Sequence, residues 1–505
     1  MFRTIAQIKT LKEKKFFIEK VNIYYKLILA FSLKNNLELN SSTIEIDESI
    51  LNKLLKLNVI VDRTELINLE KILKKELFNN FINSISFSLK YKNELGSLLD
   101  KLDTEKRLKK QKLKANKSKP KLVDFFCGAG GLSLGFIQEG FHVDLANDYE
   151  DVCIQTYRYN HPEIPENRVI HGDIRKVVDE IDTLVTTDID GVVGGPPCQG
   201  FSSANQQRMI DDPRNELYKY FIRAVEIITP KFVVMENVRG MLPYAEQVVD
   251  DYKNIKAVKD DKEFTYSIFY KVLVSDDFGV AQKRQRLIFI ALRNDIVESK
   301  EITPIDIFNR IEKSNSNTKR HVLNDALQYI KPLEAPRIKN MTEVDDEITG
   351  KKIDYNLFKG NENGYLNKIN NNKTIDFVFN HKARYTNDVN YEIYKRLDQG
   401  NDGTNSKISD IMPYKHRNHV FKDKYFKLVA DKPSRTITAH LKMDCHSHIH
   451  PFQVRSITPR EAARIQSFPD DYVFLGAYLK TYMQIGNAVP PMMARGIAKI
   501  IKEYI

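Results

Sequence analysis

The chain has 505 residues, enough for two or three domains with a sizeable core. Its 42% hydrophobic and 29% charged residues are ordinary for a globular protein, and no apolar run approaches the roughly 18 residues of a membrane span. The N-terminus lacks a secretory pattern, and the 4 cysteines form no CxxC pair, which favours a reducing cytosol over a disulfide framework.

The net charge of +11 is concentrated at one end of the chain. Residues 1–120 hold 25 Lys and Arg against 14 Asp and Glu, so the positive and negative charges of residues 121–505 cancel. A basic extension attracts polyanions, although a lysine-rich face is more often plain solvated surface.

Residues 1–100 show helical periodicity with polar breaks. Leucines within 51–57 fit one amphipathic helix, and apolar residues within 66–73 fit a second. Two short helices around a turn could form a helix-turn-helix DNA-binding unit, but Lys56 stands where a glycine would help the turn. A helical packing or dimerisation module is the favoured alternative. The lysines of 101–121 indicate a helix extension or a flexible basic linker, and with it the first domain boundary.

The next segment predicts a strand, a glycine-rich turn and a helix. The strand covers 121–126, the glycines lie at 128, 130 and 131, and the helix runs to about Glu139. Such glycines let a ligand approach the backbone and the helix N-terminus. Asp148 ends a second strand about 20 residues further on, where a carboxylate can bind ribose hydroxyls, and Asp173 follows a third strand. Each acid alone would more often cap a helix, but the combined pattern predicts a cofactor site.

A cysteine follows the next predicted strand. The apolar run 189–193 predicts a buried strand, and the Gly and Pro residues of 194–197 force a turn that places Cys198 at the carboxyl edge of a sheet. Most free cysteines are small buried hydrophobes. Here a second strand, 232–235, leads into Glu236 and Asn237, so a carboxyl group would stand on the same edge, which favours a nucleophile.

Two arginines precede an apolar strand at 287–292. Arg284 and Arg286 alternate on extended chain and should point to the same side. Surface salt bridges are the alternative interpretation.

Taken together, these segments resemble the cytosine-C5 DNA methyltransferases of bacteria. The resemblance follows the family's motif order from Lys121 to the end of the chain, and its most specific parts are Asp124-Phe-Phe-Cys-Gly-Ala-Gly-Gly, Pro196-Pro-Cys-Gln, Glu236-Asn-Val, Gln282-Lys-Arg-Gln-Arg and Gln484-Ile-Gly-Asn. It implies an α/β fold: a Rossmann-like, open, doubly wound methyltransferase lobe at 121–293 and 452–505. A small irregular target-recognition domain would be inserted at 294–451, and an α-helical basic module would precede the lobe at 1–120.

The resemblance also implies site residues. Cys198 would be the nucleophile and Glu236 the proton donor, while Asn237, Arg284 and Arg286 would hold the base and that carboxyl. The cofactor would be S-adenosyl-L-methionine, with Phe126 on its adenine. The implied cofactor contacts are Phe126, Gly128, Gly130, Gly131, Leu132, Asp148, Tyr149, Asp173, Ile174, Pro196, Leu217, Asn487, Ala488 and Val489. The implied DNA contacts are Gln199, Ser202, Arg214 and Thr438.

One cluster invites another interpretation. Residues 444–450 are rich in His and Cys, as metal sites are. Their spacing fits no usual zinc pattern, and the segment is similar to other bacterial members of the family, so we expect no metal.

Alternatives within and outside this chemistry remain. A tRNA cytosine methyltransferase shares these motifs, but the long variable segment at 293–431 favours duplex DNA. A regulatory protein with an inactive catalytic lobe is disfavoured by the complete motif set. We expect a cytoplasmic, nucleoid-associated bacterial monomer that binds double-stranded DNA, no membrane and, where one exists, a cognate restriction endonuclease that acts separately.

Overall fold

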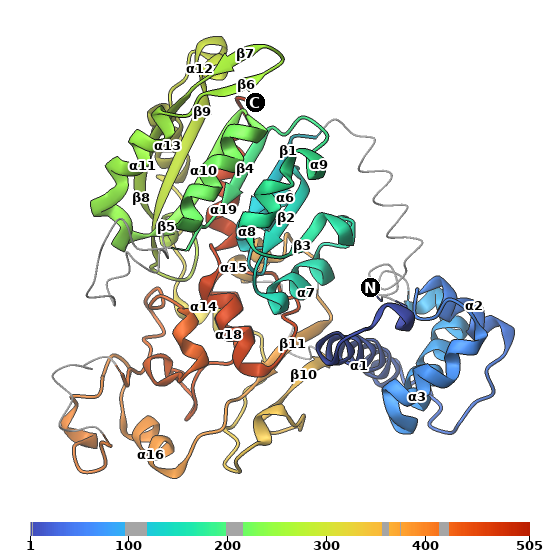
Figure 1. Cartoon of the computed structure of the whole chain (residues 1–505). Helices are drawn as coiled ribbons and strands as arrows, with labels where there is room; N and C mark the ends of the chain where they lie inside the picture. Colours follow the sequence, from blue (N-terminus) through green and yellow to red (C-terminus); the bar gives the residue numbers. More distant parts are fainter. Residues whose placement is uncertain are drawn as a thin grey trace.

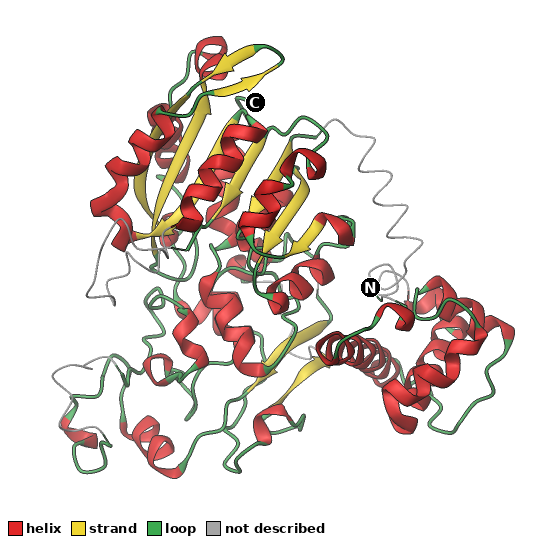
Figure 2. Ribbon diagram, viewed as in Figure 1, coloured by secondary structure: helices red, strands yellow, loops and turns green. Residues whose placement is uncertain are grey.

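The computed structural model describes residue 2 and residues 4–95, 119–197, 216–355, 363–373, 375–413 and 424–505. Within these ranges a lobe built on a large sheet stands above a smaller, irregular lobe, and a helical N-terminal module lies beside both (Figures 1 and 2). The predictions for Cys198, Gln199, Ser202 and Arg214 lie outside the described residues.

The upper lobe is an open α/β sheet. Its strands are β1 (Lys121–Phe125), β2 (His142–Asp148), β3 (Val169–His171), β4 (Gly191–Gly194), β5 (Phe232–Val238), β8 (Tyr266–Val274) and β9 (Gln285–Arg293). Among the described residues these seven strands take the order β3-β2-β1-β4-β5-β9-β8. The first five are parallel, and β9 is antiparallel to both neighbours. Strand order reverses between β1 and β4, where such folds bind ligands. The predicted fold class is confirmed.

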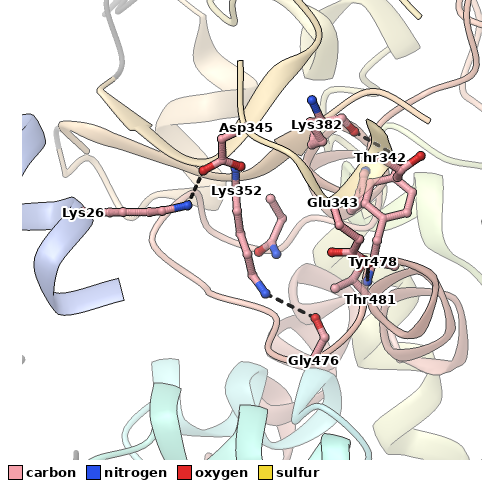
Figure 3. A pocket seen from close by; sticks show the side chains of 11 residues that line it. Lys26, Thr342, Glu343, Asp345, Lys352, Lys382, Gly476, Tyr478 and Thr481 are labelled. Atoms are coloured by element: carbon pink, nitrogen blue, oxygen red, sulfur yellow. Dashed lines mark hydrogen bonds and ion pairs between the residues drawn. The ribbon is translucent and has the colours of Figure 1, made fainter. Parts of the chain in front are cut away.

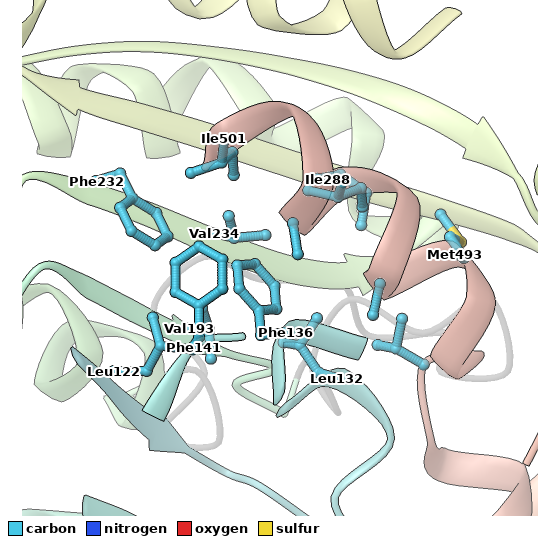
Figure 4. Close-up of a cluster of buried hydrophobic side chains, with 14 of the residues drawn as sticks. Leu122, Leu132, Phe136, Phe141, Val193, Phe232, Val234, Ile288, Met493 and Ile501 are labelled. Carbon is cyan, nitrogen blue, oxygen red and sulfur yellow. The ribbon is translucent and has the colours of Figure 1, made fainter. Parts of the chain in front are cut away.

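Helices cover both faces of this sheet. Successive strand residues point to opposite faces, so Leu122 and Val193 pack on one side, and Val123 and Val192 on the other. Figure 4 shows the first side, which is covered by α6 (Gly131–Gln138), α13 (Pro304–Asn315) and α19 (Pro491–Ile501). The second side is covered by α8 (Ile174–Asp179), α9 (Ile181–Leu184), α10 (Glu216–Ile228) and α11 (Ala245–Lys253). The edges carry α7 (Asp151–Asn160), α12 (Asn294–Lys300) and the small hairpin of β6 (Ala257–Lys259) and β7 (Lys262–Phe264).

One helix lies on a different lobe from the one expected. Ile307, Phe308 and Ile311 of α13 are buried in the same cluster as the sheet residues. Because α13 packs on this sheet, residues 294–315 belong structurally to the upper lobe, whereas we expected the inserted domain to begin at residue 294.

The lower lobe is mostly loops around short elements. It contains α14 (Leu323–Leu327), β10 (Gly350–Tyr355), α15 (Gly364–Ile369), β11 (Phe377–Lys382), α16 (Asp388–Arg396), α17 (Pro459–Ile465) and α18 (Tyr478–Asn487). Strands β10 and β11 pair antiparallel. A buried ion pair, Arg455 to Glu461 at 2.6 Å, anchors α17. Of the segment 452–505, which we expected to return to the sheet lobe, only α19 packs on the sheet, since α17 and α18 contact the lower lobe.

The N-terminal module consists of α1 (Leu11–Lys34), α2 (Glu48–Lys56) and α3 (Leu66–Lys90). Thr10 and Glu13 cap α1 reciprocally, which fixes where it begins. The hydrophobic core of the module continues into the body, because it includes Cys153 of α7, Phe379 of β11 and Leu475. The module therefore packs on the body through a shared hydrophobic core.

Polar contacts surround the same junction. Figure 3 shows Lys26 of α1 paired with Asp345, and Lys352 of β10 donating to the carbonyl of Gly476. The distance from Lys352 Nζ to that carbonyl is 3.2 Å. Lys352 also pairs with Glu19 of α1, and Lys12 lies 3.1 Å from Asp151 of α7. The module therefore contacts both lobes. In the described part of the chain, no helix combines the length and apolarity needed to cross a membrane.

Candidate active site

The glycine loop joins β1 to α6 with unusual backbone angles. Phe126, Gly128 and Gly130 all have positive φ, at 55°, 54° and 87°. An added Cβ on Gly128 would meet nothing within 4 Å, so this side of the loop is open to a ligand. Gly130 and Gly131 instead face protein: a Cβ there would lie 2.8 Å from the Tyr472 hydroxyl and 2.4 Å from the Val489 carbonyl. The lack of space requires glycine at 130 and 131, whereas at 128 the positive φ favours glycine.

Asp148 closes the loop from the next strand. Its carboxylate accepts hydrogen bonds from the Gly128 N–H at 2.8 Å and from the Glu150 N–H at 2.7 Å. Burial raises the pKa of Asp148, while these hydrogen bonds lower it. The neighbouring Tyr149 is exposed. Asp148 is therefore held at the open face of the loop.

Asp173 is the N-cap of α8. Its carboxylate accepts from the Arg175 N–H at 3.0 Å and pairs with the Arg175 guanidinium, which lowers the pKa of Asp173. This is the helix-cap alternative considered for each acid. A cap does not prevent a further contact, since a carboxylate has about four acceptor sites.

The other residues implied for the cofactor occupy varied environments. Leu132 and Ile174 are buried in the two core clusters, and Leu217 is partly buried. Ala488 and Val489 pack against Gly131, so the C-terminal segment returns to the glycine loop as expected, while Asn487 is exposed.

The carboxyl edge of β4 meets the end of β5. Glu236 Oε2 would lie 2.9 Å from a Cβ on Gly195, and Asn237 donates from Nδ2 to the carbonyl of Pro196 at 3.1 Å. Both predicted motifs therefore come together at one point, three residues before Cys198. The sequence had predicted β5 to end at Met235, but pairing with β9 continues to Val238 and fixes Glu236 and Asn237 within the strand.

The two arginines have separate partners. Arg286 Nε lies 2.5 Å from Glu236 Oε1. Arg284 is fully buried and donates to the carbonyls of Ile437 at 2.6 Å and Gly486 at 2.8 Å. Arg284 precedes β9 and binds backbone carbonyls of two distant segments, whereas Arg286 binds the carboxylate of Glu236.

A cavity of about 500 Å³ opens beside Glu236 and Arg286, lined by Val238, Arg239, Gly240, Lys283, Gln285, Arg286 and Thr436. Arg239 donates to Gln285 at 2.9 Å, and Thr436 donates to the Lys283 carbonyl at 3.2 Å. Thr438 follows Thr436 by two positions and is exposed. Sequence reasoning missed Arg239 and Lys283, although each lies within or directly after a recognised motif. The cavity is suited to an anion such as a phosphate.

The His- and Cys-rich segment has structural contacts. His446 stacks on Tyr425, Cys445 donates to the Leu441 carbonyl at 3.3 Å, and His450 accepts from the backbone N–H groups of Phe452 and Gln453. The described residues contain no group of three His, Cys, Asp or Glu that could hold a metal ion.

Comparison with known proteins agrees with this geometry. A family model for C-5 cytosine-specific DNA methylases matches residues 120–503. The chain belongs to this family. It is thus a DNA cytosine-5 methyltransferase with an N-terminal helical extension outside the family match.

Individual members of the family match over most of their length. Type II methyltransferase M.DdeI of Desulfomicrobium norvegicum is 33% identical over 395 residues, which are 76% of this chain and 88% of that protein. Type II methyltransferase M.AgeI of Thalassovita gelatinovora is 31% identical over 449 residues, covering 76% of this chain and 100% of its own. The crystal structure of a DNA modification methyltransferase encoded within an E. coli prophage aligns with TM-score 0.55 at 23% identity, covering 76% of this chain and 99% of that one, and supports the fold.

Proposed function

We propose that this methyltransferase transfers a methyl group from S-adenosyl-L-methionine to C5 of a cytosine flipped out of duplex DNA, through a covalent bond between Cys198 and C6. The similarity to type II methyltransferases favours a role in a restriction-modification or marking system. The observation that carries the proposal is the meeting of the Gly195-Pro196 turn with Glu236 and Arg286.

The residues at the glycine loop fit the proposed cofactor. Gly128 leaves the loop open, Asp148 offers a carboxylate beside it, and Phe126 directly follows the strand that leads into it. A bound S-adenosyl-L-methionine supplies an electrophilic methyl group on a sulfonium. The chain's part is to hold that group near the turn that carries Cys198.

Nucleophilic addition explains the need for a thiol. Cytosine C5 is a weak nucleophile, and a thiolate that adds at C6 turns the ring into an enamine whose C5 can attack a methyl group. Cys127, Cys153 and Cys445 are buried, and burial raises the pKa of each thiol, which disfavours a thiolate at those positions. Cys198 is therefore the candidate nucleophile.

Glu236 is suited to donate a proton. Burial raises its pKa, so its carboxyl group can carry a proton for N3 of the cytosine as the thiolate adds. Arg286 and Asn237 hold the carboxyl and its strand. A base then removes the C5 proton, and the thiolate leaves. Because C6 is shielded within a duplex, the base must be flipped out. Arg239 and Lys283 would hold flanking phosphates in the adjoining cavity.

The test is bisulfite sequencing of plasmid DNA recovered from a host that expresses the full chain, with Cys198→Ser as its matched variant. We expect protected cytosines in one sequence context for the wild type and a loss on the order of 10⁴-fold or more for the variant. Near-normal methylation by Cys198→Ser would overturn the mechanism.

A further inference from the structure

A short segment between α17 and α18 contacts both lobes and the N-terminal module. Residues 472–476, named here the 472–476 strip, have no regular secondary structure. The side chain of Asn160 in α7 donates to the Val473 carbonyl at 2.7 Å and accepts from its N–H at 2.9 Å. Thr156, one turn earlier in α7, accepts from the Leu475 N–H at 3.0 Å. The strip is therefore fixed to the catalytic lobe along its backbone.

The same strip is held from two other directions. Asn380 of β11 accepts from the Phe474 N–H at 3.0 Å and donates to its carbonyl at 2.9 Å. Glu19 of α1 accepts from the Gly476 N–H at 2.9 and 3.0 Å. The lower lobe, the sheet lobe and the N-terminal module thus all bind this segment of five residues, and their side chains satisfy its backbone N–H and C=O groups.

Tyr472 connects this strip to the glycine loop. Its hydroxyl donates to the carbonyl of Ala129 and lies 3.1 Å from His161 Nε2. Its ring is 4% exposed and packs between Phe468 and Phe474. The carbonyl of Tyr472 accepts from Arg460, which also donates to the Phe379 carbonyl of β11. Arg460 therefore holds the backbone of Tyr472, and Ala129 and His161 hold its hydroxyl.

The loop needs such an external contact. Between Cys127 and Gly131 it consists of Gly and Ala, which carry almost no side chain to fix the backbone. Gly130 has φ +87°, and a Cβ there would lie within 3.1 Å of Tyr472, Tyr157 and His161. These three side chains shape the inner side of the turn whose outer side, at Gly128, is open.

We propose that Tyr472 is a positioning residue for the methyl donor: its hydroxyl holds the Ala129-Gly130 turn in the shape that lets Gly128 and Asp148 receive S-adenosyl-L-methionine. The inference rests on the proposed function, because it assumes that cofactor. A tyrosine that only filled the core would contribute to stability and leave cofactor affinity unchanged.

The test compares two tyrosines that each lose a buried hydroxyl. Tyr472→Phe removes the bond to Ala129. Tyr482→Phe is the matched control, since its hydroxyl donates to the Ile457 carbonyl at 2.6 Å and contacts Tyr478, away from the loop. For both full-length variants and the wild type, calorimetry gives the Kd of S-adenosyl-L-methionine, steady-state kinetics gives KM and kcat on DNA, and thermal unfolding gives Tm.

We expect Tyr472→Phe to raise the Kd and KM for the cofactor about tenfold, and up to about a hundredfold, because a buried carbonyl loses its donor. Its kcat at saturating cofactor and its DNA affinity should stay near the wild type. Tyr482→Phe should lower Tm comparably with an unchanged Kd. His161→Gln, which perturbs the same hydroxyl, should shift the Kd in the same direction by less, and serves if Tyr472→Phe does not fold.

Two results would overturn the inference. One is a wild-type cofactor Kd in Tyr472→Phe and His161→Gln. The other is an equal rise in Tyr472→Phe and Tyr482→Phe, which would attribute the effect to stability. If the wild type itself does not bind S-adenosyl-L-methionine, the proposed function fails and this inference with it, so the two failures are distinguishable.

Discussion

Glu236 Oε1 lies 2.5 Å from Arg286 Nε, and each side chain is only 11% exposed. Burial raises the pKa of Glu236, and the positive charge of Arg286 lowers it. These opposing effects suit a group that must carry a proton in one step and bear charge in the next. The pair lies on neighbouring strands, so its geometry is set by the pairing of β5 with β9.

The first prediction concerns the proton on Glu236. Glu236→Gln should lower the single-turnover methylation rate by about 10²- to 10⁴-fold, because an amide can hydrogen-bond N3 but cannot transfer a proton. The wild-type rate should fall as the pH rises through the pKa of Glu236, whereas the variant should lack that pH dependence. Rapid-quench assays at several pH values measure both. An active variant that keeps the wild-type pH profile would remove Glu236 from the mechanism.

The second prediction concerns Asp148. Asp148→Ala should weaken S-adenosyl-L-methionine binding by about 1.5–3 kcal/mol, since it removes a charged acceptor from the open face of the loop. Calorimetry measures the change. Asp144→Asn is the control, because Asp144 lies in the same strand but pairs with Arg168. Equal affinities for the wild type and Asp148→Ala would mean that the ribose contact lies elsewhere.

The third prediction is a pH dependence of stability. Burial raises the pKa of Asp124 to about 8, so the folded state holds a proton that an unfolded aspartate releases near its ordinary pKa of 3.8. The stability from this proton is fully present below the unfolded pKa and is lost as the pH rises towards 8, by up to about 1.4 kcal/mol per pH unit. Asp124→Asn should flatten the fall in unfolding free energy between pH 5 and 8.

Urea unfolding at pH 5, 6.5 and 8 checks this. Asp188→Asn is the matched control: its side chain is 91% exposed, and Lys259 lowers its pKa, which puts its own titration below this pH window. The same slope for Asp124→Asn and the wild type would show that Asp124 is ionised in the folded protein.

The fourth prediction concerns the N-terminal module. Deleting residues 1–95 would uncover apolar partners on α7, β11 and the 472–476 strip, so the truncated chain should aggregate or lose thermal stability. Any soluble fraction should keep the recognition sequence and the salt slope of DNA binding. A stable truncation with a flatter slope would instead show that the module contacts phosphates.

A point variant tests the same contact with a smaller change to the protein. Glu19→Ala should lower Tm, because Glu19 binds Lys352 and the Gly476 N–H, while Glu70→Ala on the exposed face of α3 should not. Thermal unfolding of both variants distinguishes a seated module from a loosely attached one.

The local sequence pattern predicted the strands of the sheet and the two turns that follow β1 and β4, because buried strands and tight turns depend on neighbouring residues. It ended β5 early, since Glu236 and Asn237 are polar, while the pairing that extends the strand comes from β9. It did not predict the carbonyl groups that Arg284 binds. The partners of Arg284 lie 153 and 202 positions away, and no local pattern contains them. The apolar face of α13 was visible in the sequence, but its position on the sheet was not.

The contact between Glu19 and Gly476 joins positions 457 residues apart. During synthesis α1 leaves the ribosome among the first elements, but its partners around Leu475 and Met483 follow only near the end of the chain. Domains usually fold as they emerge, N-terminal first. Until those partners emerge, part of the apolar surface of α1 is uncovered, and such exposed surface favours aggregation or binding to a chaperone. Complete seating of α1 therefore requires that the segment around Leu475 and Met483 has been synthesised.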